Sequence, residues 1–271
     1  MKLTLRDRFY LARKKLLARF KRKLIGSSVS AFIVDTLQGR FAVDPEDQGV
    51  GQMLISNNQY DFEVVTRWSK TVGKEDEVLI VGGHIGSLAI PLSKACRSLD
   101  AVEANPETFK LLELNKYLNN CGNLNLYNCA AGEKKGHLEF YASKVNSGGS
   151  KRRPVHDSLL YTYDHPDVVK VEMKVLDEVF AGKSYKLAII DIEGSEYFAL
   201  QGMQELLKQI EILQIEFIGH HLENVASVTN EQFFELLIPH FSKIEINREV
   251  FKLENFDYRN FRDDTDLIFY K

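Results

Sequence analysis

Cysteine is scarce in this 271-residue sequence, and its three copies fit no cross-linking or metal-binding pattern. Cys96, Cys121 and Cys129 are odd in number, form no CxxC pair and have no histidine nearby at metal-ligand spacing. This excludes a disulfide framework and gives no reason to expect a metal site, so we interpret the three side chains as reduced thiols of a cytosolic protein.

Long apolar runs are also missing. The longest, Val78 to Leu92, contains His84, three glycines and a proline, and therefore does not predict a membrane-spanning helix. No secretory hydrophobic region follows the initial methionine. The sequence thus predicts a cytoplasmic location.

Acidic residues are nearly absent from the first 25 positions. This segment holds ten of the 35 basic residues and one acid, Asp7, which leaves the rest of the chain with a charge near −12. Its apolar residues recur every three or four positions and predict a basic amphipathic helix over residues 1–26: Leu5, Phe9, Ala12, Leu16, Phe20 and Leu24. Such a helix suits an anionic membrane or an acidic partner, whereas packing on its own acidic body or on a second subunit, or a transit peptide, is an alternative explanation.

Residues 27–75 read as an N-terminal extension. A hairpin turning at Leu37-Gln38-Gly39 is followed by one short helix and a longer one that begins near Tyr60. From residue 76 onwards the pattern becomes a regular alternation of strands and helices. We expect strands at 77–81, 98–104, 123–131, 137–143, 169–176, 185–193, 211–219, 243–247 and 266–271, and helices at 85–95, 105–120, 196–208 and 229–241.

This alternation predicts one α/β domain over residues 76–271, with a doubly wound, mostly parallel, seven-stranded sheet of Rossmann-like type. The last two strands have no helix between them, so we expect the final strand to run antiparallel.

Glycines at the first strand-to-helix turn suggest a cofactor site. Gly82, Gly83 and Gly86 would let the backbone approach a ligand and leave N–H groups free at a helix N-terminus, although tight packing alone can require such a turn. Glu103 lies 21 residues after Gly82, at the end of the next strand, where an acid can accept hydrogen bonds from ribose hydroxyls.

A second group of acids follows the apolar strand "KLAII". Asp191 and Glu193 lie where strand ends line the ligand crevice, and two carboxylates there need a proton, a cation or an ammonium group nearby. Glu196 is better explained as a first-turn residue of the following helix.

Several segments together resemble one family. The stretches "VLIVGGHIGSLAIPL", "AVEANPETFKLLELNKYLNN", "NLYNCAAG", "VKVEMKVLDEVF", "LAIIDIEGSEYFALQGMQELL" and "ILQIEF" resemble, in order and spacing, the FkbM-type methyltransferases over about residues 30–220. The most specific match is D-x-E-G-x-E, formed by Asp191, Glu193, Gly194 and Glu196.

The resemblance implies an S-adenosylmethionine-dependent O-methyltransferase acting on a hydroxyl of a sugar, polyketide or similar metabolite. It also implies cofactor contacts from the glycine turn with His84, from Glu103 and Ala104, and from Cys129 to Ala131, Ala130 included. Asp191, Glu193 and His220 are the candidate catalytic groups, and no metal is assigned. His221 and the polar loop with Asn146, Ser147 and Ser150 are weaker candidates.

The chain departs from the family pattern at two strand positions. The family usually has an acid where this chain has Ile80 and a lysine where it has Ile189, and His84 replaces an asparagine. We expect Asp191 to serve the cofactor's ammonium group in place of the missing acid, and an Ile80→Asp change to rescue the loss of Asp191. A degenerate fold that acts as a binding module through its basic helix is the alternative to an enzyme. We expect a small-molecule or glycan acceptor and no nucleic acid, and oligomerisation stays open.

Overall fold

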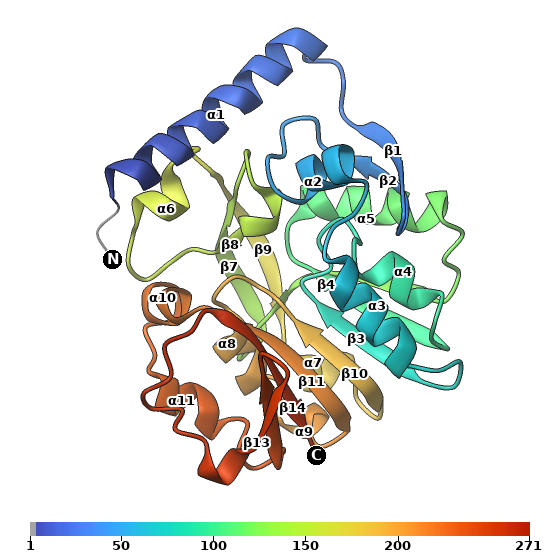
Figure 1. Ribbon diagram of the computed structural model, residues 1–271, viewed down its shortest axis with the longest axis vertical. Coiled ribbons are helices and arrows are strands. Elements are labelled where there is room, and N and C mark those ends of the chain that lie inside the picture. Colours follow the sequence, from blue (N-terminus) through green and yellow to red (C-terminus); the bar gives the residue numbers. More distant parts are fainter. Residues whose placement is uncertain (1–3) are drawn as a thin grey trace.

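An eight-stranded sheet forms the centre of the molecule, and the computed structural model describes residues 4–271 (Figure 1). Its strand order is β5, β4, β3, β10, β11, β14, β12, β13; the first five strands are parallel and the last three pair antiparallel. The bounds are Glu77–Val81 (β3), Ser98–Glu103 (β4), Leu124–Asn128 (β5), Tyr185–Ile190 (β10), Ile210–Phe217 (β11), Lys243–Ile246 (β12), Glu249–Lys252 (β13) and Thr265–Tyr270 (β14).

The α/β fold with a mostly parallel sheet is therefore confirmed, and β14 does run antiparallel to β11. The sheet has eight strands rather than seven because the chain turns back after β12 and adds β13 at the edge. All four residues of β13 are exposed, so the apolar alternation that marks a buried strand is absent there.

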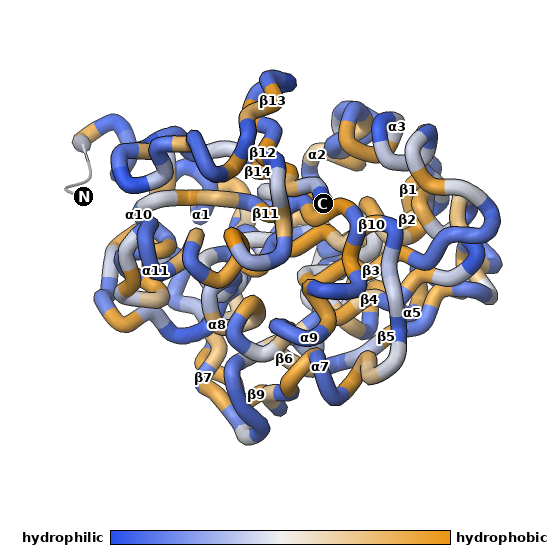
Figure 2. Tube along the Cα trace, turned by 90° about the horizontal axis from the view of Figure 1, so that it is seen from below, coloured by the Kyte–Doolittle hydropathy of each residue, from blue (hydrophilic) through white to orange (hydrophobic). Residues whose placement is uncertain are grey.

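Both faces of the sheet are buried, which explains the nearly continuous apolar sequences of its parallel strands. Alternate strand residues point to two separate cores. One core packs under the helices at residues 196–201, 204–207 and 230–235, and the other under the helices at residues 50–57, 62–71 and 89–93 and the N-terminal hairpin. The hydropathy-coloured tube likewise shows hydrophobic residues concentrated along the central strands (Figure 2).

The helices are shorter than the sequence pattern suggests. Their bounds are Leu5–Ile25 (α1), Val50–Asn57 (α2), Phe62–Thr71 (α3), Ala89–Ser93 (α4), Pro106–Leu118 (α5), Leu159–Thr162 (α6), Leu176–Val179 (α7), Glu196–Gln201 (α8), Gln204–Leu207 (α9), Gly219–His221 (α10) and Asn230–Glu235 (α11). The helix predicted over 85–95 is only α4, because turns continue from the glycines to residue 88. The helix predicted over 196–208 is interrupted at Gly202, where a Cβ atom would lie 2.0 Å from the carbonyl oxygen of Gly132.

A separate four-stranded sheet stands beside the carboxyl ends of the central strands (Figure 1). Its order is β6, β9, β7, β8, with bounds Ala130–Ala131 (β6), Gly136–Ala142 (β7), Lys151–Arg152 (β8) and Asp167–Lys174 (β9). The strand predicted over 123–131 is thus divided at Cys129 between the two sheets. The predicted strand at 137–143 pairs antiparallel with β9 and belongs to this smaller sheet.

The N-terminal extension packs onto the central domain. The predicted hairpin is present as β1 (Phe32–Thr36) and β2 (Gly39–Val43). The buried side chain of Asn115 on α5 accepts a hydrogen bond from the Ala42 amide (2.6 Å) and donates to the Ala42 and Ile85 carbonyls (3.1 and 2.8 Å). Trp68 of α3 lies in the core and donates through its indole N–H to Gln214. These contacts hold the extension over the glycine turn.

The predicted basic helix is present as α1, which lies along one edge of the molecule (Figure 1). Thr4 and Asp7 form a capping box at its start, which explains why the helix begins at Leu5. In the described part of the chain, every helix is too short or too polar to cross a bilayer.

Candidate functional site

A cavity of about 370 Å³ lies at the carboxyl ends of β3, β4 and β10, where parallel sheets of this kind bind their ligands. Most of the residues singled out from the sequence line it: Gly82, Gly83, His84, Glu103, Ala104, Ala130, Asp191 and Glu193. Gly86 lies outside the lining, packed against Leu112 and Ile90. A second cavity adjoins this one at Asp191 and Glu216, and His220 lines neither of the two. The Nδ1 atom of His220 lies 4.0 Å from the carboxylate of Asp264.

The glycine turn is built differently from a helix N-terminus with free amides. The Gly82 and Gly83 N–H groups both donate to the carbonyl oxygen of Val102 (2.9 and 2.8 Å), so neither is free for a ligand. Gly82 has φ of 100°, and a Cβ atom there would lie 1.8 Å from the carbonyl oxygen of Asp191. For Gly82 and Gly83 the prediction of free N–H groups is therefore wrong. The glycine instead allows two strand ends to approach closely, which places Asp191 beside the turn.

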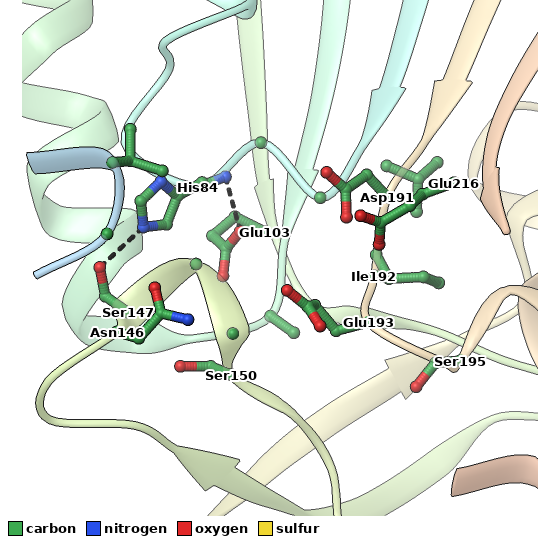
Figure 3. A pocket seen from close by; sticks show the side chains of 18 of the residues that line it. His84, Glu103, Asn146, Ser147, Ser150, Asp191, Ile192, Glu193, Ser195 and Glu216 are labelled. Atoms are coloured by element: carbon green, nitrogen blue, oxygen red, sulfur yellow. Dashed lines mark hydrogen bonds between the residues drawn. The ribbon is translucent and has the colours of Figure 1, made fainter. Parts of the chain in front are cut away.

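Glu103 closes the next strand and points into the cavity (Figure 3). Its side chain is held by the amides of His84 and Asn105 (2.7 Å each) and by the Thr108 hydroxyl (3.1 Å). Glu103 is 8% exposed. A carboxylate fixed in this way presents its remaining lone pairs to the cavity with little loss of side-chain entropy.

Three carboxyl groups gather opposite Glu103. Asp191 and Glu216 face each other, and Glu193 reaches the same cavity from the turn after β10 (Figure 3). Three residues that line the cavity have φ in the left-handed region: Glu193 (56°), His84 (47°) and Asp61 (46°). Such backbone strain in non-glycine residues is concentrated at functional sites.

The surroundings of the Asp191–Glu216 pair favour its holding a proton. Desolvation by the surrounding protein, with the charges of Glu193 and Glu196, raises the pKa of Asp191, although its side chain is exposed where it lines the two cavities. Burial and the charge of Asp191 also raise the pKa of Glu216. A cationic ligand that displaced this proton would stabilise the ionised pair.

Glu193 is held by two buried residues behind the cavity. The Lys151 ammonium lies 3.0 Å from Glu193 Oε2 and 3.3 Å from Nε2 of His221, and His221 Nδ1 lies 3.5 Å from the same carboxylate oxygen. Burial and Lys151 lower the pKa of His221 to about 2, so its ring is neutral. Glu193, Glu216 and His221 bring ligand atoms within 4.8 Å of one another, but the Lys151 ammonium already supplies the cation here, and we assign no metal.

The loop over 143–150 covers one side of the cavity (Figure 3). The Ser147 hydroxyl is hydrogen-bonded to His84 Nε2 (2.8 Å), and the Ser147 amide donates to Asp47 (3.0 Å). The Gln48 amide donates to the Val145 carbonyl (2.7 Å). We call residues 143–150 the covering loop.

Comparison with known proteins now identifies the family. Residues 81–259 match the family described as the Methyltransferase FkbM domain. The chain belongs to the FkbM methyltransferase family. No curated protein sequence matches it.

Several solved structures are similar to this chain at low identity. Methyltransferase FkbM from Methylobacillus flagellatus KT is 17% identical, with a TM-score of 0.43; the match covers 73% of this chain and 44% of that one. Trm5b from Pyrococcus abyssi is 14% identical, with a TM-score of 0.45, covering 90% and 56%. Precorrin-6y C5,15-methyltransferase from Geobacter metallireducens GS-15 is 9% identical, with a TM-score of 0.43, covering 77% and 89%. This chain thus spans less than half of the FkbM structure.

The two departures from the FkbM pattern are neighbours. Ile80 and Ile189 are cross-strand partners in the β3–β10 ladder, and each is 2% exposed in the same core. An acid and a lysine at these positions would be buried side by side, and this chain has an apolar pair there instead. Ile80 lines neither cavity, and an acid restored there would be buried among hydrocarbon side chains. The structure therefore opposes the predicted rescue by Ile80→Asp alone.

We expect Ile80→Asp to lower the free energy of unfolding by roughly 3–5 kcal/mol, because it buries an unpaired carboxyl. The double change Ile80→Asp with Ile189→Lys should recover part of that loss, since the two side chains can pair. Chemical denaturation of both variants and of Ile189→Lys alone gives the coupling energy. Additive effects of the two changes would show that the positions do not interact.

Several site residues escaped the sequence interpretation. Glu216 is the penultimate residue of β11, and its only signal was an acid near the end of an apolar strand beside Asp191. Lys151 stands in a run of three basic residues, a pattern typical of solvent-exposed positions, yet it is 5% exposed. Of the adjacent histidines, His221 rather than His220 contacts Glu193, which depends on the direction of the short helix α10.

Proposed function

We propose that this FkbM-family protein is an S-adenosylmethionine-dependent O-methyltransferase whose acceptor is a small hydroxylated metabolite, such as a sugar or polyketide. The observation that carries the proposal is the meeting of two cavities at the Asp191–Glu216 pair. One cavity has the features of a cofactor site, and the other is lined by hydrogen-bond acceptors.

The first cavity fits the cofactor. Glu103 is placed to accept hydrogen bonds from ribose hydroxyls, and the small side chains of Ala104 and Ala130 leave room for the adenine. Asp191, brought against Gly82, is the acceptor we assign to the ammonium group of the methionine part. When bound, the cofactor supplies an electrophilic methyl group on a sulfonium.

The second cavity, of about 360 Å³, fits the acceptor. It shares Tyr60, Asp61, Leu88, Asp191 and Glu216 with the first. Its other polar lining comes from Gln214, Asp264, Thr265 and Asp266, with no basic residue in the described lining. Carboxyl and amide oxygens accept hydrogen bonds from hydroxyl groups, which favours a polyhydroxylated acceptor over a phosphorylated one.

Methyl transfer to a hydroxyl needs alignment and removal of one proton. Glu193 lines the first cavity only, but its carboxylate lies within 4.8 Å of Glu216, which lines both cavities. We assign it to the hydroxyl proton of an acceptor that reaches this junction, because its partners fix its position there. Lys151 and His221 act as positioning residues behind it. The covering loop forms part of the wall of the first cavity.

Glu103→Ala should weaken S-adenosylmethionine binding by roughly 1.5–3 kcal/mol, because it removes charge-assisted hydrogen bonds to the ribose. Calorimetric titration measures the change. Glu103 also holds the His84 amide, so Glu103→Gln serves as the matched variant that keeps the shape and one acceptor oxygen. If folded Glu103→Ala kept the native affinity for S-adenosylmethionine, the cofactor would not bind at the position assigned here.

The test of the function combines binding with a metabolite screen. Titration with S-adenosylmethionine should show saturable binding, and methyl-labelled cofactor should transfer its label to a hydroxylated metabolite. Transfer of the label to a carbon or nitrogen atom would contradict O-methylation but would still support methyltransferase activity. Absence of cofactor binding would favour a degenerate binding module instead.

A further inference from the structure

The apolar stripe of α1 points away from the protein. Leu5, Phe9, Leu16 and Phe20 are 61–86% exposed. At about 100° per residue they lie within roughly 60° of one another. The helix contacts the protein through its opposite side, where Ala18 is buried. We call these four residues the α1 ridge.

The basic residues of α1 divide in the same way. Those facing the protein are tied to it: Lys15 donates to the Tyr163 carbonyl, Lys21 to Gln52, and Arg22 to Glu46 and the Val29 carbonyl. Five others are exposed and make no side-chain hydrogen bond or ion pair with residues 4–271: Arg6, Arg8, Arg13, Arg19 and Lys23. The protein-facing contacts therefore hold the helix with an apolar ridge and five cations turned outward.

We propose that the α1 ridge and its flanking cations form a docking surface for an anionic lipid bilayer. Apolar side chains at the centre of a helix face and arginines beside them fit the acyl–headgroup boundary. A second copy of the chain fits less well, because ridge-to-ridge contact would bring together the exposed cations of both copies. A nucleic acid would neutralise the cations but leave the ridge in water.

Docking through α1 places the first cavity close to the membrane. Tyr10 and Lys14 line that cavity from the side of α1 opposite the ridge. The cavity wall is thus about one helix diameter, roughly 10–12 Å, from the docked surface. An acceptor held at the headgroup level would be near the site. This consequence rests on the proposed function, whereas the docking itself does not.

The test uses the full chain and sedimentation with vesicles. Vesicles of phosphatidylcholine with phosphatidylserine should bind the protein, pure phosphatidylcholine should bind it at least about tenfold less, and high salt should release it. The ridge variant Leu16→Gln with Phe20→Gln should bind more than about tenfold less. The cation variant Arg13→Gln, Arg19→Gln and Lys23→Gln should do the same, at roughly fivefold per residue.

A matched control changes exposed apolar residues on another helix. Leu114→Gln with Tyr117→Gln on α5, 41% and 75% exposed in the native chain, should leave vesicle binding unchanged. Circular dichroism and S-adenosylmethionine titration check that each variant is folded, and loss of cofactor binding alone would bear only on the proposed function.

Three results would overturn the docking proposal. One is no binding to anionic vesicles, and another is binding that the ridge variant leaves intact. The third is a dimer that analytical ultracentrifugation detects without lipid and that the ridge variant abolishes, combined with no binding of the native protein to vesicles. That last result would make the ridge a subunit interface.

Discussion

Asp191→Asn should weaken S-adenosylmethionine binding at least about 30-fold. Replacing one partner of a buried ion pair costs roughly 2–5 kcal/mol, and the asparagine leaves the ligand's ammonium group without an anionic acceptor. The change preserves shape, so loss of binding would report charge rather than packing. Calorimetric titration of the variant and of the exposed control Asp263→Asn separates the two.

The same carboxyl predicts a pH dependence. Burial and the neighbouring carboxylates raise its pKa well above the usual range, whereas the ammonium group binds its ionised form. Binding at a pH below that raised pKa must release a proton, so affinity should rise with pH through the neutral range, by up to about tenfold per pH unit. Titration in buffers of different ionisation enthalpy measures the released proton. Asp191→Asn should lose this dependence. If that variant kept its cofactor affinity but lost turnover, Asp191 would instead be a catalytic residue.

Glu193→Gln should lower kcat by about 10²–10⁴ while changing cofactor affinity less than about twofold, because proton removal matters only in the transition state. The measurement requires the acceptor identified by the metabolite screen, and single-turnover kinetics would isolate the chemical step. Glu223→Gln makes the same chemical change on an exposed side chain and should retain native kcat.

A positioning role for Lys151 predicts a different signature. Lys151→Met should lower kcat less than Glu193→Gln does, and it should shift the pH profile of kcat, because the ammonium lies 3.0 Å from the Glu193 carboxylate. Equal losses with unchanged pH profiles in the two variants would indicate that the cluster is structural.

Local sequence patterns predicted the alternating strands and helices of the parallel sheet. The parallel strands are apolar and separated by helices of ordinary length, and Asn105 and Pro106 mark the start of α5 by direct capping chemistry. Elements that depend on distant contacts were not predictable in this way. Gly202 breaks a helix because Gly132 approaches it, and β13 exists only through its pairing with β12.

The candidate site was likewise predictable only where local sequence patterns determine it. Glu103 and Asp191 were found because strand ends in this topology meet at one edge. Lys151 comes from a short strand of the second sheet, and no sequence spacing connects it to Glu193, 42 positions later. The pairing of Ile80 with Ile189 likewise became visible only with the register of two strands that are distant in sequence.

The covering loop sets a kinetic condition on catalysis. Its bonds to His84, Asp47 and Gln48 join it to other segments around the first cavity. Under the proposed function, we expect exchange of used for fresh cofactor to require that these bonds break, so that loop opening contributes to the residence time of the demethylated product. An enzyme built this way becomes limited by product release once chemistry is fast.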